Sequence, residues 1–241
     1  MLMSAKTADK VRVGNVQIAQ ETAVRWVRDY TDAERNTARP NPYAYPAYDE
    51  YERENNDPRR LTDADLLSPV LLNVGLSIRA FYGLQRIRGT LEKGLANEDL
   101  RRPLAEIDNP ERVAGMVTPL YGVLDNSQTE PWGVKGTTLS KILHRKAPQS
   151  LVLHDKWVRA CYVGDNGPVP RARDRSWADY MVAVTTAVGE DIRTQPGAFA
   201  QLDAATGAAG RLSHVRLLDI LAWKSQGGSP VDEPEPTSEI A

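Results

Sequence analysis

The chain has 241 residues and a mass of 26.7 kDa, long enough to bury one substantial core or two smaller lobes. Hydrophobic residues make up 41% and charged residues 26%, as in an ordinary soluble globular protein. The net charge of −2 argues against a protein that coats nucleic acid nonspecifically, although it allows a local basic cleft.

The single cysteine, Cys161, excludes an intrachain disulfide and an iron–sulfur cluster held by four thiolates. Three histidines without a second cysteine form no spaced zinc motif, and no Gly-rich nucleotide loop is present. We therefore expect no metal and no cofactor. The first ten residues lack the apolar core of a signal peptide, and no run approaches a membrane span. The expectation is a cytoplasmic protein without a membrane partner.

The N-terminal part is predicted to contain one helix and one long loop. Residues 1–14 are expected to form a loose start, and Val16–Tyr30 has apolar residues at helical spacing, which predicts a helix. Four prolines between Thr37 and Pro58 exclude a regular helix there. Four tyrosines also lie in this loop: Tyr43, Tyr45, Tyr48 and Tyr51. Their rings either pin the loop to the core or form a cleft wall that stacks a nucleobase.

Three helices are predicted in the centre of the chain. Thr62 caps the first, with Asp65 as the second member of a capping-box-like pair, and this helix extends to about Val74. The second spans Ser77–Lys93 and has one apolar face. Its basic residues fall mostly off that face; they are Arg79, Arg86, Arg88 and Lys93. This position favours a solvated helix surface over a DNA-binding surface. The third helix opens at Asn109-Pro110 and reaches about Val123.

The segment from Trp132 to Gly164 is the most informative part of the sequence. It opens with a Gly-bounded turn, residues 133–136, followed by a helical run over Thr137–Arg145. Such a turn aims backbone N–H groups outward, where they suit a phosphate oxygen. An apolar triplet, residues 151–153, then leads to Asp155, at the start of another predicted helix. The sequence thus predicts a carboxylate at a fixed distance from a phosphate-binding turn.

Beyond Gly164 the pattern is again helical. An arginine-rich loop over residues 165–175 either touches phosphates or is simply solvated. Ser176 caps a predicted helix over Trp177–Ile192, residues 207–210 form a flexible joint, and the last helix spans Leu212–Lys224. The acidic, Pro-rich tail, residues 227–241, is predicted to be disordered. No sustained two-residue alternation occurs, so the fold is predicted to be mainly α.

The segment around Asp155 resembles the helix-hairpin-helix DNA glycosylase superfamily, the group of endonuclease III, MutY and AlkA. The superfamily's hairpin, G-V-G-x-[KSTQ]-[TA]-A, lies over Gly133-Val134-Lys135-Gly136-Thr137-Thr138-Leu139. Its essential aspartate follows the [KSTQ] position by eighteen residues, as Asp155 follows Thr137. Lys135 departs from the pattern by replacing the second glycine, which shifts the expected turn onto Gly136. The match covers about a seventh of the chain.

This resemblance implies a two-lobed helical fold with a cleft between the lobes. Residues 1–60 and 156–226 are expected to form one lobe, and residues 61–155, with the hairpin, form the other. The implied partner is double-stranded DNA with a flipped base. The expected DNA-binding residues are Gly133, Val134, Lys135, Gly136, Thr137, Thr138, Lys141 and Lys156; the expected base pocket is Tyr43, Tyr45, Tyr48 and Trp157.

The resemblance also implies a reaction, in which Asp155 stabilises the oxocarbenium-like sugar or activates water. Asp155 can equally serve as a plain helix cap. Bifunctional members carry a lysine where Thr137 stands, so the implied enzyme is a cluster-free, monofunctional glycosylase that leaves an abasic site. Lys141 and Lys156 lie close to Thr137 and Asp155 in the sequence. Either could supply the attacking amine from a different position, or both could contact phosphates. Two alternatives also stay open: a noncatalytic DNA-binding protein, and a defence glycosylase that acts on modified bases of foreign DNA.

Overall fold

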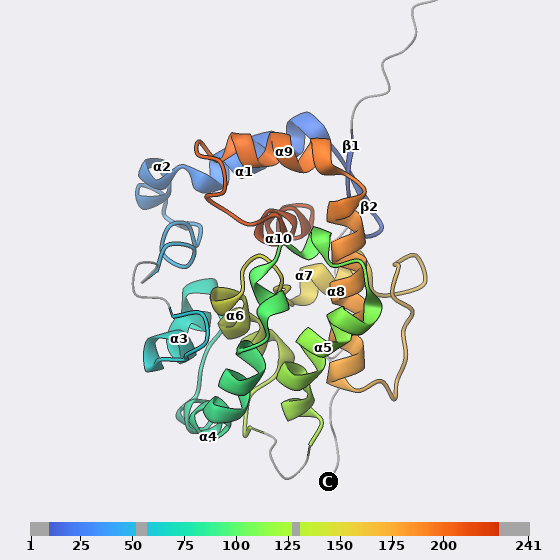
Figure 1. Cartoon of the computed structure of the whole chain (residues 1–241). Helices are drawn as coiled ribbons and strands as arrows, with labels where there is room; N and C mark the ends of the chain where they lie inside the picture. Colours follow the sequence, from blue (N-terminus) through green and yellow to red (C-terminus); the bar gives the residue numbers. More distant parts are fainter. Residues whose placement is uncertain (1–9, 52–56, 127–130, 227–241) are drawn as a thin grey trace, which may run out of the picture.

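The computed structural model describes residues 10–51, 57–126 and 131–226, and helices dominate this part of the chain (Figure 1). The α-helices are α1 (Gln20–Thr31), α2 (Ala33–Thr37), α3 (Asp63–Leu67), α4 (Ile78–Leu95), α5 (Pro110–Tyr121), α6 (Gly136–Lys146), α7 (Lys156–Tyr162), α8 (Trp177–Arg193), α9 (Pro196–Ala205) and α10 (His214–Lys224). Short 3₁₀ turns are η2 (Ser68–Leu72), η3 (Glu98–Arg101), η4 (Leu104–Glu106) and η5 (Gly122–Leu124). The mainly α prediction is confirmed.

A small β-hairpin precedes the helices, which corrects two sequence expectations. β1 (Lys10–Val13) pairs antiparallel with β2 (Val16–Ala19), so residues 10–13 are not loose and the first helix begins at Gln20 rather than Val16. The strands are too short to show a pattern, and tertiary contacts hold their turn. Gly14 donates its N–H to Asp191 at 2.6 Å, and a Cβ on Gly14 would lie 2.1 Å from the Cys161 carbonyl oxygen.

Most helix starts follow local hydrogen bonds that the sequence predicts. Thr62 and Asp65 form the capping box, and Ser77 and Ser176 cap α4 and α8 through their side chains. The predicted helix from Thr62 to Val74 is interrupted: α3 ends at Leu67, and η2 continues to Leu72 before Asn73 adopts a left-handed φ of 58°. Helix α9 was not predicted; it directly precedes the glycines that were interpreted as a joint.

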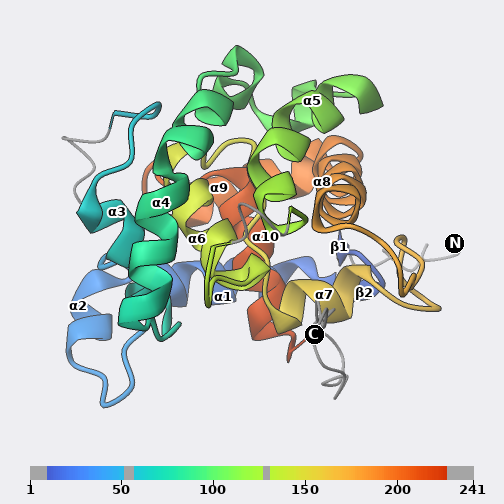
Figure 2. The same cartoon turned by 90° about the horizontal axis from the view of Figure 1, so that it is seen from below.

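The two ends of the described chain pack together. Helix α1 contacts α9 and α10, and α10 also contacts α7 (Figures 1 and 2). The central helices form their own contacts, α3 with α4 and α6, and α4 with α5. Helix α8 lies along α5 and connects the two groups. The predicted tail, residues 227–241, lies outside the described residues, as do residues 1–9, 52–56 and 127–130.

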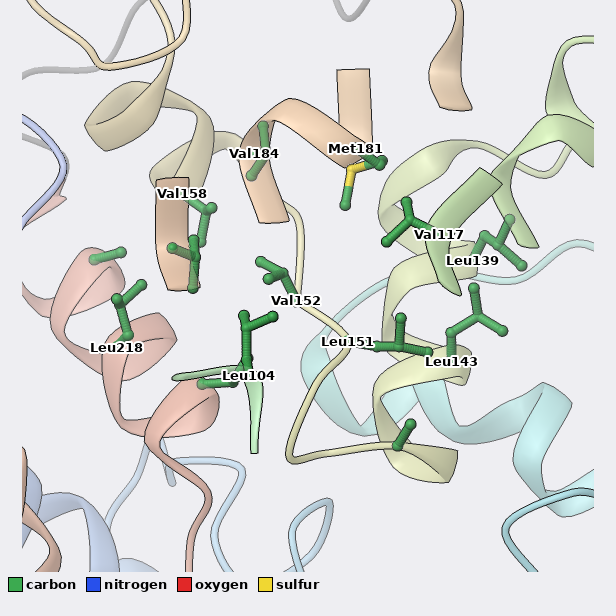
Figure 3. Close-up of a cluster of buried hydrophobic side chains, with 14 of the residues drawn as sticks. Leu104, Val117, Leu139, Leu143, Leu151, Val152, Val158, Met181, Val184 and Leu218 are labelled. Atoms are coloured by element: carbon green, nitrogen blue, oxygen red, sulfur yellow. The ribbon is translucent and has the colours of Figure 1, made fainter. Parts of the chain in front are cut away.

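The apolar triplet Leu151-Val152-Leu153 passes through the core. All three side chains are buried, as predicted. Figure 3 shows Leu151 beside Leu143 of α6, while Val152 lies on the side of Val158 and Val184. Burial of large apolar side chains stabilises each by about 1.5–3 kcal/mol relative to exposure. The triplet therefore fixes the start of α7 against both α6 and α8.

Candidate functional site

The turn before α6 is built by two glycines with different roles. Gly133 has a φ of +73°, and Val134 donates its N–H to the Pro131 carbonyl at 3.1 Å, which closes the turn. Gly136 is the first residue of α6, and a Cβ there would lie 2.3 Å from the Trp177 ring. The left-handed residue is thus Gly133, and the turn is not shifted onto Gly136. Gly136 is needed because Trp177 packs against its backbone.

The predicted DNA-binding residues differ in exposure. Gly133, Lys135 and Lys156 are exposed, and Thr137 is half-buried. Val134, Gly136, Thr138 and Lys141 are buried. The solvent-facing part of the turn therefore consists of Gly133 and Lys135, and its buried neighbours Val134 and Gly136 pack behind it.

Asp155 is the N-cap of α7, as predicted. Its Oδ1 accepts hydrogen bonds from the backbone N–H groups of Trp157 at 2.8 Å and Val158 at 3.1 Å. Within the described part of the chain, Oδ2 accepts no hydrogen bond and forms no ion pair. One carboxylate oxygen thus orients the side chain, and the other is available to a ligand.

Asp155 lines a pocket formed by segments that are far apart in the sequence, called the Asp155 pocket below. Its empty space, including the open mouth, is about 570 Å³. Its walls come from α1, the tyrosine loop, the end of η2, α6, the start of α7 and α10. The lining residues are Tyr30, Pro42, Tyr43, Ala44, Leu72, Asn73, Lys141, Asp155, Arg216, Asp219, Ile220 and Trp223.

Lys141 supplies an amine to this pocket. It stands one helical turn after Thr137 on α6, and its side chain is only 5% exposed. Its carbonyl accepts the Tyr48 hydroxyl at 2.6 Å, but its ammonium has no hydrogen bond or ion pair within the described residues. A buried ammonium without a fixed partner is costly unless a nearby anion balances it. The carboxylates on the pocket wall provide that balance.

Two charged residues of α10 complete the polar wall. Arg216 pairs with Asp49 at 2.6 Å and with Asp219, and the Tyr30 hydroxyl donates to Asp49 at 2.7 Å. Burial raises the pKa of Asp219 to about 6; the charge of Arg216 opposes this shift, and that of Asp155 adds to it. Asp219 is therefore a buried carboxyl that changes its protonation near neutral pH.

The opposite wall is aromatic. Tyr43 stacks on Tyr30 with ring centroids 5.8 Å apart, and it is nearly perpendicular to Trp223, with ring centroids 5.3 Å apart. The Tyr43 hydroxyl accepts a hydrogen bond from Lys224 at 2.6 Å and donates to Asp29 at 3.1 Å. These bonds hold the half-buried ring at the pocket, and the Arg39 guanidinium and the Lys224 ammonium lie over it, 4.3 and 3.9 Å from its centroid.

Comparison with known protein families identifies the chain. Residues 23–226 match a family described as a family of unknown function (DUF6308). The chain belongs to this family. The matched region contains every lining residue of the Asp155 pocket and leaves out the β-hairpin. Comparisons with curated proteins and with solved structures found no match.

The DUF6308 region does not bring all four predicted base-pocket residues together. Tyr43 lines the pocket. Tyr45 and Tyr48 are buried at 3% and 2% exposure, with hydroxyls bonded to Glu50 and to the Lys141 carbonyl. Trp157 is not among the residues that line the pocket, and the Lys156 ammonium lies over its ring, 4.5 Å from the centroid. Tyr45 and Tyr48 thus pin the loop to the core, the first of the two interpretations of these rings.

Sequence reasoning missed the contribution of α10. Asp219 interrupts an apolar run, Leu217-Leu218-Asp219-Ile220-Leu221, and a carboxylate in such a run is a signal that it has a buried role.

In the described residues no three His, Cys, Asp or Glu side chains are grouped to hold a metal ion. None of the described helices is both long and apolar enough to cross a membrane.

Proposed function

We propose that this DUF6308 member is a DNA glycosylase-like enzyme that flips a damaged or modified base and hydrolyses its N-glycosidic bond. The observation that carries the proposal is the Asp155 pocket. A carboxylate with one free oxygen, an amine and a stacked aromatic wall meet there, directly after the hairpin that resembles the glycosylase motif. Clustered ionisable groups in a pocket that also has apolar walls are typical of catalytic sites.

The residues divide between binding the base and acting on the sugar. The aromatic wall formed by Tyr43 and Trp223 would contact the flipped base, whose extrusion from the duplex costs a few kcal/mol. Asp155 would face the sugar, with Oδ1 fixed by the two α7 N–H groups and Oδ2 free to stabilise positive charge at C1′. The turn at Gly133 and Lys135 would hold a backbone phosphate.

The proposed step is a hydrolysis in which atoms and charges balance. A water oxygen bonds to C1′ while the bond from C1′ to the base nitrogen breaks. Asp155 takes a proton from the water, and the departing base takes a proton from Asp219, the second carboxyl of the pocket. The Lys141 ammonium lowers the cost of placing two carboxyls together. The products are a free base and an abasic site.

The packing of the helices supports this proposal. Helix α1 contacts α9 and α10, while α3, α4 and α6 form a separate set of contacts, as expected for a two-lobed glycosylase. The extensive α5–α8 contact is an additional link between the two sets. Thr137 has no amine, which supports a monofunctional reaction.

A screen of released bases tests the proposal. Damaged, mismatched and hypermodified duplexes are incubated with the protein, and free bases are measured by mass spectrometry. We expect one class of base to be released, and only by protein with an intact Asp155. DNA binding without release of any base would instead favour the noncatalytic alternative. Release confined to hypermodified DNA would favour the defence glycosylase.

A further inference from the structure

The exposed large hydrophobic side chains of the described residues are gathered in one region. They come from the end of α3, from η2, from the start of α4 and from the turn before α6. The set is Leu67, Val70, Ile78, Tyr82 and Trp132, with exposures of 48%, 53%, 75%, 62% and 52%. Single exposed apolar residues are ordinary, but a cluster confined to one region indicates an interaction surface.

The turn and α4 form one continuous face. Gly83 permits close packing, because a Cβ there would lie 2.9 Å from the Trp132 backbone nitrogen. The guanidinium groups of Arg86 and Arg79 lie 4.5 and 5.8 Å from the centroid of the Trp132 ring system. Helix α4 lies at the lower left edge of the molecule in Figure 1. We call the group Ile78, Arg79, Tyr82, Arg86 and Trp132 the α4–turn face.

The α4–turn face and the Asp155 pocket are built on neighbouring segments of the chain. Leu72 and Asn73, which line the pocket, end η2 just before α4 begins. Helix α6, which carries Lys141 into the pocket, begins directly after the turn and contacts η2. The elements that carry the face thus lead directly into the elements that line the pocket.

The charge of the region fits a polyanion. Residues 66–91 and 131–154 contain no Asp or Glu, although the chain has 32 of them. Several basic residues there are paired with acids from outside: Arg88 with Asp63, and Arg145 and Lys146 with Asp65. Arg79 and Lys135 are exposed on the side of the turn, and neither of these two segments contains an acidic residue. The predicted solvated character of Arg79 and Arg86 is thus incomplete, since both stack on Trp132.

We propose that the α4–turn face binds the unpaired bases of a DNA strand next to the nucleotide held in the pocket; this rests on the proposed function. An intact duplex keeps its bases stacked inside and offers phosphates and base edges. Unstacked bases expose apolar faces, on which aromatic side chains stack with little sequence preference. Ile78 and Tyr82 meet those faces, and Arg79 and Arg86 meet the phosphates. The preferred substrate is DNA with locally unpaired bases.

Fluorescence anisotropy with dye-labelled oligonucleotides tests this inference. The probes are a single strand, a duplex with a central bubble and a fully paired duplex of the same sequence. The bubble should bind at least about tenfold more tightly than the paired duplex, the scale of one stacked base. Tyr82→Ala should remove that preference, and Tyr82→Phe should keep it. Arg79→Glu should weaken binding of all probes and flatten the salt dependence.

Two controls separate binding from folding. Tyr82 is exposed, so thermal unfolding of Tyr82→Ala should match the wild type. Arg25→Glu makes the same charge change at an exposed position of α1, which lies far from α4 in Figure 1, and should leave the affinity for all three probes and its salt dependence unchanged. Equal affinity for bubble and duplex, or a Tyr82→Ala protein that keeps the preference, would overturn the inference. So would light scattering that shows a dimer dissolved by Tyr82→Ala. If binding depends on Tyr82 but no base is released, the glycosylase proposal is rejected, while the α4–turn face is still supported as a binding surface for unpaired bases.

Discussion

Lys141 and Asp155 line the same pocket, Lys141 from α6 and Asp155 from the start of α7. The thirteen residues of chain between them include the buried triplet Leu151-Val152-Leu153, which fixes the two helices relative to each other. A buried amine without a partner in the described chain thus shares a cavity with a carboxylate that has one free oxygen. This relationship sets the expectations for the site variants.

Asp155→Asn should abolish base release while the protein stays folded. Asn caps helices about as well as Asp, so α7 should form and unfolding should change little. DNA binding should persist or tighten, because a negative charge near phosphates is gone. We expect base release to fall by about two orders of magnitude or more. A folded variant with full release would refute the role of Asp155, whereas an unfolded one would favour a structural cap.

The product strand should remain intact until alkali or heat is applied. Thr137 cannot form a Schiff base with the sugar, so borohydride should trap no covalent adduct with DNA. Gel analysis of end-labelled product measures both effects. A trapped adduct would contradict this expectation, and Lys141→Ala would then be the decisive variant. Lys156→Ala is the matched control, because Lys156 is exposed and absent from the pocket lining.

Lys135→Glu should weaken DNA binding by a similar factor for every sequence. Lys135 is the exposed N-cap residue of α6, beside the turn that is proposed to hold a phosphate. Loss of one phosphate contact should reduce the slope of log affinity against log salt by about one. Titrations at several salt concentrations measure the slope. Altered base preference at constant affinity would show that Lys135 reads bases instead.

Asp219 should give the reaction and the stability a pH dependence. As the proposed acid, with a pKa of about 6, it should support base release below that pH and lose this ability as pH rises. The raised pKa means that the folded state binds the proton more tightly than the unfolded state. The contribution of Asp219 to stability is therefore full below about pH 4 and declines towards pH 6 and above.

The Asp219→Asn variant isolates this effect. Its free energy of unfolding, minus that of the wild type, should rise by about 2 kcal/mol between pH 4 and pH 6, the larger part of the roughly 3 kcal/mol that a shift of about two pKa units is worth. The comparison is needed because burial lowers the pKa of His144 to about 4, which makes stability rise with pH in the same window. Urea unfolding at matched pH values measures the difference. A flat difference would contradict a raised pKa for Asp219.

Gly136→Ala should destabilise the fold at the site. The new Cβ would lie 2.3 Å from the Trp177 ring, and such overpacking costs about 1–3 kcal/mol. Gly115→Ala is the matched control on α5, where a Cβ meets nothing within 4 Å, and it should stabilise the protein by about 0.4–1 kcal/mol. Thermal unfolding compares the two. Equal stability of both variants would show that Trp177 does not pack on Gly136.

The sequence by itself determined the helical class and most of the helix starts. The caps at Thr62, Ser77, Asp155 and Ser176 are hydrogen bonds between residues two or three positions apart, so they can be read along the chain. The burial of residues 151–153 follows from their apolar character between polar neighbours. Asp155 was therefore placed correctly at its helix before any tertiary contact was known.

Only the tertiary structure decided what surrounds Asp155. Tyr43 and Tyr48 are similar in sequence context, yet one lines the pocket and the other bonds to the Lys141 carbonyl in the core. Asp219 joins the site because α10 folds back against α1 and α7, across more than sixty residues of chain. The β-hairpin likewise depends on Asp191 and Cys161. The physical reason is that such contacts form only once the core has closed, and no local pattern records them.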